Sequence, residues 1–275
     1  MKGRPPVSSP RGVQRNESIA VTEGTHSRRP IPEAHTEFHS LPTRKLQVDV
    51  LRDEADLNAF IQTVSGARFN RYLKASNGDK RSAVALHHAN AKISQCLYLP
   101  IQIWEIALRN RLNTFLIWKY NSRWPWDQRA LRALSSGDKR RLSEVLDRQA
   151  RRRGSENIHT DAVVADLSAG FWVSLLTKSY DVPFVWRNTI ARIFPADTSI
   201  SREDAYRICE KLLDLRNRIA HHEPIYHRPL PAIHDDMDRI IAALCDRHGA
   251  YLSFASTFAT DWLTVKECLD EATTK

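Results

Sequence analysis

The side chains best suited to chemistry lie in LRNRIAHHEPIYH, residues 215–227. Arginine is a permanent cation with a planar fork of donors, and histidine, with an unperturbed pKa of about 6.5, exchanges protons at neutral pH. Asn217 and His221 are four residues apart, so on a helix they lie about 40° from each other, with Arg216 on a flank of the same edge. This set suits metal-independent RNA cleavage, in which the imidazole takes the proton of a ribose 2′-OH and the guanidinium stabilises the phosphorane. One arginine and one histidine are too few groups for complete acid–base chemistry, which favours a second copy of the chain across a two-fold axis.

Two other interpretations of this segment stay open. At the end of a helix, arginines and histidines cap unpaired carbonyls and interact favourably with the helix dipole, which is a purely structural role. A metal site is less favoured, because His221 and His222 point about 100° apart on a helix and HEP is not the HExxH of zinc enzymes. We therefore expect neither a metal ion nor another cofactor.

The helix that carries the segment is predicted over residues 201–222. Ser201 and Asp204 have capping-box spacing at its start, and Pro224 stops it. The candidate residues thus lie at the C-terminal end of a helix. The apolar stripe of this helix comprises Ala205, Ile208, Leu212, Leu215 and Ile219.

The rest of residues 46–275 also indicates helices. This part has only six glycines and little strand-like alternation, so we predict an all-α fold. We expect a helix over 53–64 whose spacing continues in ARFNRYLKA, and a turn at SNGD (76–79). A helical region ending before Pro100 and a separate helix over 101–120 follow. The last pair of helices comprises HDDMDRIIAALCDRHG and the segment up to about Leu269. The predicted apolar stripe of the 101–120 helix comprises Ile103, Ile106, Ala107, Asn110, Leu112, Phe115 and Leu116. Core packing is favoured over base stacking for Phe171, Trp172, Phe184 and Trp186.

The charge of the chain favours a polyanionic partner. It has 41 Lys and Arg against 32 Asp and Glu, a net charge of +9 and a pI near 9.6, and RNA is the expected partner. An amphipathic basic helix is predicted within residues 135–155, where a solvated face and an RNA-backbone stripe are both open. The arginines of the RNA-binding hypothesis are Arg140, Arg141, Arg148, Arg151, Arg152 and Arg153.

Residues 1–45 differ from the rest of the chain. They hold six of the thirteen prolines and no apolar periodicity, so we predict a disordered basic tail before a single domain over 46–275. No run of 18 apolar residues and no apolar leader segment occurs, which favours a cytoplasmic protein without membrane contact. The four cysteines stand far apart without a CxxC pair, which argues against structural zinc and indicates reduced core residues.

Several of these motifs occur together in one known family. Arg216-Asn217-x-x-x-His221 matches the arginine-polar-x3-histidine signature of HEPN ribonucleases, and LRNRIAHHEPI, residues 215–225, closely resembles the C-terminal signature of Abi-like (abortive infection, AbiD/AbiF-type) bacterial proteins. IWEIALRNRL (103–112), the WPW that follows it, GFW (170–172) and Trp186 resemble the other landmarks of that family in the same order. The resemblance covers roughly residues 85–265. The family's aspartate-tryptophan pair is absent from HHANAKISQCLYLP, residues 87–100.

The resemblance implies a HEPN-type helical bundle with additional helices, and a homodimer that brings two such motifs together. It further implies metal-independent RNA cleavage in defence against phage or as a toxin, with an antitoxin or noncoding RNA among the expected partners. The alternative is a noncatalytic RNA-binding or regulatory HEPN module. Arg216, Asn217 and His221 would be the catalytic set, and His222 would cap the helix or carry protons in their place. Glu105 and Arg109, four residues apart, would form a structural pair or support the motif from a facing helix, and the structural pair is favoured.

Overall fold

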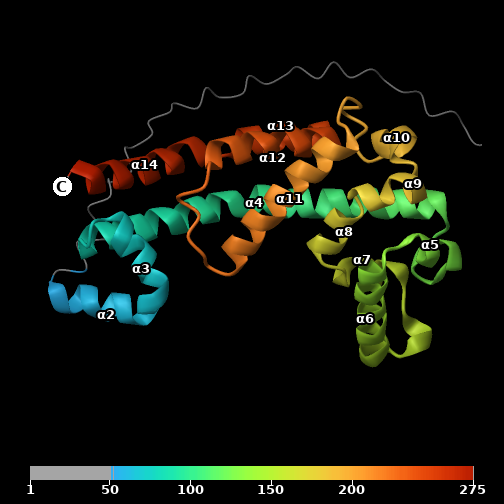
Figure 1. Cartoon of the computed structure of the whole chain (residues 1–275), viewed down its shortest axis with the longest axis horizontal. Helices are drawn as coiled ribbons and strands as arrows, with labels where there is room; N and C mark the ends of the chain where they lie inside the picture. The colour runs from blue at the N-terminus through green and yellow to red at the C-terminus, as the bar shows by residue number, and fades with distance from the viewer. Residues whose placement is uncertain (1–50, 52, 275) are drawn as a thin grey trace, which may run out of the picture. The chain divides into compact units, whose positions relative to one another are not determined.

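The computed structural model describes residue 51 and residues 53–274, and all regular secondary structure in this part of the chain is helical (Figure 1). The all-α prediction is therefore confirmed. The predicted tail, residues 1–45, and the predicted start of the domain at residue 46 lie outside the described residues. The α-helices are α2 Glu54–Val64, α3 Gly66–Ala75, α4 Lys80–Lys119, α5 Gln128–Ala133, α6 Ser136–Arg153, α7 Thr160–Asp166, α8 Ala169–Ser174, α9 Asp181–Phe184, α10 Trp186–Thr189, α11 Arg202–Ala220, α12 Leu230–Leu244, α13 Asp246–Ala255 and α14 Phe258–Thr274. The 3₁₀ helices are η1 Trp124–Trp126, η2 Ser155–Asn157, η3 Lys178–Tyr180 and η4 Ile190–Arg192.

One helix, α4, runs for 40 residues straight through Pro100, so the predicted break at this proline is wrong. A proline inside a helix removes one backbone hydrogen bond and costs roughly 3 kcal/mol. Burial offsets this cost, because Leu97 and Ile101 on either side of the proline belong to the core. The helix contacts α3, α8, α11, α12 and α14, and Figure 1 shows it alongside α12 and α14.

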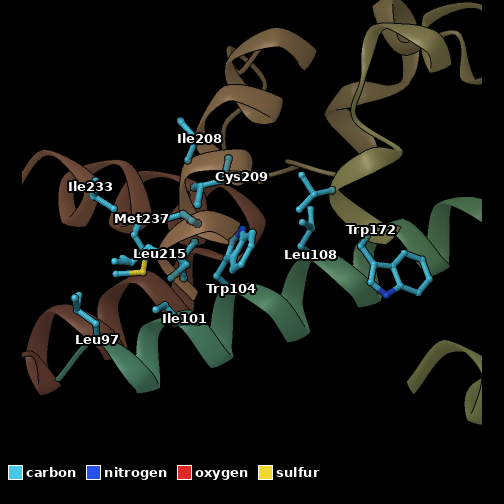
Figure 2. Packing of buried hydrophobic residues seen from close by; sticks show 14 of the residues in the cluster. Leu97, Ile101, Trp104, Leu108, Trp172, Ile208, Cys209, Leu215, Ile233 and Met237 are labelled. Atoms are coloured by element: carbon cyan, nitrogen blue, oxygen red, sulfur yellow. The ribbon is translucent and has the colours of Figure 1, made fainter. Parts of the chain in front are cut away.

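The buried face of α4 differs from the predicted stripe. Trp104 and Leu108 are buried, whereas Ile106 is 38% exposed and Asn110 is exposed. The indole of Trp104 points toward α11 and lies against Cys209 and Leu215 in Figure 2. The large aromatic side chain therefore sets which face is buried, and the face that carries Ile106 is left open to solvent.

Helix α11 begins as predicted and ends two residues before the predicted end. The Ser201 hydroxyl accepts a hydrogen bond from the Asp204 N–H at 3.0 Å and donates one to the Asp204 carboxylate at 2.7 Å. Four members of the predicted stripe are buried, and Ile219 is half-buried at the edge of the core. The apolar face of α11 packs on α4, α8 and α12, which holds the last turn of the helix against α4.

The aromatic landmarks pack in the core, so the packing prediction is confirmed. Phe171, Trp172, Phe184 and Trp186 are all buried. The indole N–H of Trp186 donates to the carbonyl of Leu175 at 3.0 Å. These side chains hold the C-terminal half of α4 against α8, α9 and α10.

A buried carboxylate fixes the start of the predicted basic helix, α6. Asp138 accepts hydrogen bonds from the Tyr180 hydroxyl at 2.6 Å and the Ser174 hydroxyl at 2.8 Å. Burial and the bond to Asp138 raise the pKa of Tyr180 to about 12. Helix α6 is thereby fastened at its N-terminal end to α8 and η3.

The cysteines agree with their predicted reduced state. All four are free thiols, with Cys209 and Cys268 buried and the other two partly buried. Burial raises the pKa of the Cys209 thiol to about 12, which makes it inert as a nucleophile. Within residues 53–274, no helix has the length and apolar character needed to cross a bilayer.

Candidate functional site

The candidate catalytic residues lie on the last turn of α11 and in the cap that ends it. His221 is the C-cap residue, with φ −95° and ψ 8°, and its N–H donates to the carbonyl of Asn217 at 2.9 Å. Both residues are exposed. No described side chain hydrogen-bonds the His221 ring. The imidazole is therefore free to meet a ligand or a second protein chain.

His222 follows in a left-handed conformation, with φ 56°. Its N–H donates to the carbonyl of Ile219 at 3.0 Å, and the N–H of Glu223 donates to the carbonyl of Arg218 at 2.8 Å. These two bonds define a Schellman motif, which usually places glycine at the left-handed position. His222 thus caps the helix through its backbone, and its imidazole remains exposed beside His221.

The Arg216 guanidinium is held by an acid on the facing helix. Its Nε donates to Glu105 Oε2 at 3.2 Å, and its Nη1 donates to Asn217 Oδ1 at 3.4 Å. The Arg216 side chain is 39% exposed and that of Glu105 is 26% exposed. Glu105 therefore fixes the guanidinium in place while leaving part of it open to an incoming phosphate.

The predicted structural pair between Glu105 and Arg109 does not form in the described part of the chain, since Glu105 binds Arg216 instead. The Nε of Arg109 is buried and has no hydrogen-bond partner among the described residues. The spacing of four residues describes contacts within one helix, and it favoured the local pair. It carries no information about α11, which crosses α4 at Glu105. Of the two supporting candidates, Glu105 contacts the motif.

Sequence reasoning missed Asn90 of α4, which holds the loop that follows the motif. Its Oδ1 accepts from the N–H of Ile225 at 2.7 Å and from the N–H of Tyr226 at 3.1 Å. Asn90 is buried, so the two bonds are shielded from water. The available signal was a single amide among Ala89, Ile93 and Leu97 on the buried face of a helix. This segment is the one that lacks the aspartate-tryptophan pair.

Ion pairs fasten the same loop to α11. Arg218 bonds Glu223 at 2.9 Å and Asp214 at 3.4 Å, and Arg228 also pairs with Asp214. The hydroxyl of Tyr226 donates to the carbonyl of Arg71 in α3 at 3.0 Å. The second arginine of the motif, Arg218, is therefore engaged in structure, and Arg216 is the one that faces α4.

Two hollows flank the end of α11. The first, of about 330 Å³, has Glu105 and Arg216 in its wall. The second, of about 630 Å³, is lined by His87, His222 and other groups of α3 and α4. Burial lowers the pKa of His87, which keeps this ring neutral at neutral pH. Both hollows share one wall, which consists of Tyr98, Ile219 and Ala220.

The basic helix α6 divides into two parts. Arg140 pairs with Glu144 at 3.8 Å, Arg141 with Asp138 at 3.0 Å, and Arg148 with Asp166 at 2.8 Å. These three are partly neutralised by carboxylates on α6 and α7. The exposed arginines of the last turn form no ion pair with any described residue: Arg151, Arg152 and Arg153.

A metal role finds no support at the end of α11. In residues 53–274, no group of three or more His, Cys, Asp or Glu side chains is placed to hold a metal ion. His227 is exposed and lies against Tyr226, and partial burial and nearby arginines lower its pKa. The cluster of His221, His222, Glu223 and His227 in the sequence thus forms no such group.

No family model, curated protein or solved structure that we compared matches this chain. The interpretation of the site therefore depends on its own residues and geometry. The last turn and cap of α11 carry a held guanidinium, an exposed amide and an exposed imidazole, and the guanidinium lies in the wall of the smaller hollow. This arrangement can bind a phosphate and exchange a proton with a group next to it.

Proposed function

We propose that the protein is a metal-independent endoribonuclease. The observation that carries the proposal is the contact between Arg216 and Glu105, which fixes a partly exposed guanidinium on the helix end that also carries the free His221 ring. The resemblance of residues 215–225 to the signature of Abi-like HEPN proteins supports the same chemistry. RNA is the substrate class that the net charge of +9 favours.

In this reaction His221 takes the proton of a ribose 2′-OH, and the resulting oxygen attacks the adjacent phosphorus. Arg216 stabilises the negative charge on the phosphorane, and Asn217 orients a phosphate oxygen or the imidazole. The bond to the 5′-oxygen breaks, which leaves a 2′,3′-cyclic phosphate and a 5′-OH. Protonation of the leaving oxygen needs an acid, and a second copy of the chain supplies it in a homodimer whose interface includes the end of α11.

The biological role that goes with this chemistry is defence against phage by abortive infection, or toxin activity held in check by an antitoxin or noncoding RNA. Both roles place the protein in the cytoplasm, where its RNA substrates are. The exposed arginines at the end of α6, Arg151 to Arg153, are surface charges suited to hold an RNA backbone, because none of them forms an ion pair with a described carboxylate.

The test is cleavage of total RNA by purified protein in the presence of EDTA. Wild type is expected to cleave RNA and leave DNA intact, and Arg216→Ala and His221→Ala are each expected to lower the rate about 10²–10⁴-fold. Arg132→Ala on α5 and His248→Ala on α13 are matched controls, since both side chains are exposed and line neither hollow. Cleavage that survives the first two substitutions, or that needs magnesium or zinc, contradicts the assignment.

A noncatalytic RNA-binding module is the second candidate, and one observation favours it. Glu105 already pairs with Arg216, so the guanidinium has less charge to offer a phosphorane, while its exposed part can still contact a phosphate of bound RNA. If this function is correct, wild type binds RNA in the same assay without cutting it, and Arg216→Ala weakens the binding.

A further inference from the structure

The two hollows beside the motif belong to one track along α4. The residues of α4 that line them recur every three or four positions, which places them on one face of the helix. From His87 to Ile106 this face is about 28 Å long, at 1.5 Å per residue. That length is many times the spacing of about 3.4 Å between charges along one strand of a duplex, so it can hold more than one nucleotide of a more extended single strand. The end of α11 meets the track near its middle, at Tyr98.

Tyr98 is the feature of this track that packing leaves unexplained. It is 62% exposed, and no described residue stacks on its ring or hydrogen-bonds its hydroxyl. Two exposed amides lie on either side of it along α4, Gln95 in the larger hollow and Gln102 in the smaller one.

We propose that Tyr98 is a stacking platform for an unpaired base of single-stranded RNA, and this inference rests on the proposed function. A base stacked on the ring places the phosphate next to it against Arg216, because both side chains line the smaller hollow. Unpaired bases are recognised by stacking on aromatic rings and by hydrogen bonds to their edges, which Gln95 and Gln102 can supply. The hollows, of about 330 and 630 Å³, suit one or two splayed nucleotides, whereas bases inside a duplex are not available to the ring.

The partly exposed guanidinium of Arg216 is the feature that favours RNA over a protein as the occupant of this track. It lies in the same wall as Tyr98 and is held by Glu105. Glu223 lines the larger hollow, so the attraction for a polyanion comes from Arg216 and from the net charge of +9 of the chain. The proposed homodimer has its interface at the end of α11, so the track beside it has to remain open if RNA is to reach Tyr98. Contact of Tyr98 with a second copy is therefore an outcome of the test that overturns the proposal.

The test measures binding in the full-length His221→Ala protein, which does not consume its ligand, with a fluorescein-labelled single-stranded RNA of mixed sequence. Tyr98→Ala and Tyr98→Leu both remove the π face and are expected to weaken binding about 5- to 150-fold. Tyr98→Phe keeps the face and is expected to bind like the parent. Tyr251→Ala is the matched control, since Tyr251 of α13 is 56% exposed and lines neither hollow. Binding of the same RNA as a duplex is expected to be weaker and insensitive to residue 98.

The outcomes separate this inference from the proposed function. Tyr98-dependent binding together with a wild type that cuts no RNA supports the stacking platform and rejects the nuclease. RNA cleavage together with unchanged binding by Tyr98→Ala and Tyr98→Leu rejects the platform and keeps the nuclease. Loss of a dimer by either variant in light scattering, with RNA binding by the remaining species unchanged, assigns Tyr98 to a contact between copies and also rejects the platform.

Discussion

The adjacent histidines of the motif allow a direct test of the cap that ends α11. His221 has φ −95° and His222 has φ 56°, and both side chains are exposed. Replacing each in turn by glycine removes the same side chain from the same stretch of chain. The two variants differ in one respect, since only His222→Gly relieves a left-handed conformation of a residue with a Cβ.

The magnitudes follow from this difference. A left-handed conformation costs a non-glycine residue roughly 1–2 kcal/mol. Glycine also gives the unfolded chain more freedom, which costs either variant about 0.4–1 kcal/mol. We therefore expect His221→Gly to lower the free energy of unfolding by about 0.4–1 kcal/mol and His222→Gly to raise it by up to about 1.6 kcal/mol. The difference between the variants is about 1–2 kcal/mol, because the cost in the unfolded state is common to both.

Urea denaturation and thermal melts followed by circular dichroism measure this difference. At about 2–4 °C per kcal/mol, the melting temperatures of the two variants are expected to differ by about 2–8 °C. His222→Val serves as an opposite control, because a β-branched residue is strained further at this position. Equal destabilisation by both glycine variants would refute the left-handed cap, and with it the described placement of the two imidazoles.

Four further outcomes are expected. Asn90→Ala leaves two buried backbone N–H groups without an acceptor and is expected to cost about 1–3 kcal/mol for each, measured by urea denaturation. Glu105→Gln keeps an acceptor for Arg216, so its RNA cleavage is expected to exceed that of Glu105→Ala, while neither variant changes stability by more than about 1 kcal/mol; equal rates for the two would argue against the orienting role. Light scattering at micromolar concentration is expected to give a dimer, and an active monomer would contradict the shared site. Deletion of residues 1–45 is expected to leave the melting temperature unchanged, and a clear drop would show that they belong to the fold.

Most of the helices could be predicted from the sequence because local signals determine them. Capping-box spacing indicated the start of α11, and the helix predicted over 53–64 corresponds to α2. The turn at 76–79 follows from Asn77 and Gly78, both of which have positive φ. The end of α4 before WPW was also indicated by the sequence. The fold class and the location of the motif at a helix end therefore needed no tertiary information.

The errors occur where tertiary packing overrides a local rule. Pro100 signals a break in the helix, but buried contacts on both sides keep α4 continuous. Glu105 has a partner at the favoured spacing in its own helix, yet it binds Arg216, which is 111 residues away in the sequence. The roles of Asn90 and Tyr98 depend on which segments cross α4, and spacing along the chain carries no information about that crossing.

The proline within α4 lies between the two points where this helix contacts Arg216 and the loop after the motif. Asn90 hydrogen-bonds the loop after the motif, and Glu105 hydrogen-bonds Arg216. The two residues are about 22 Å apart along α4, at 1.5 Å per residue. Pro100 removes one backbone hydrogen bond from α4 between Asn90 and Glu105, so the helix resists bending less at this point. A bend at Pro100 rotates the segment of α4 that carries Asn90 relative to the segment that carries Glu105. A force applied to either end of α4 therefore changes the distance between the loop and the Arg216 guanidinium.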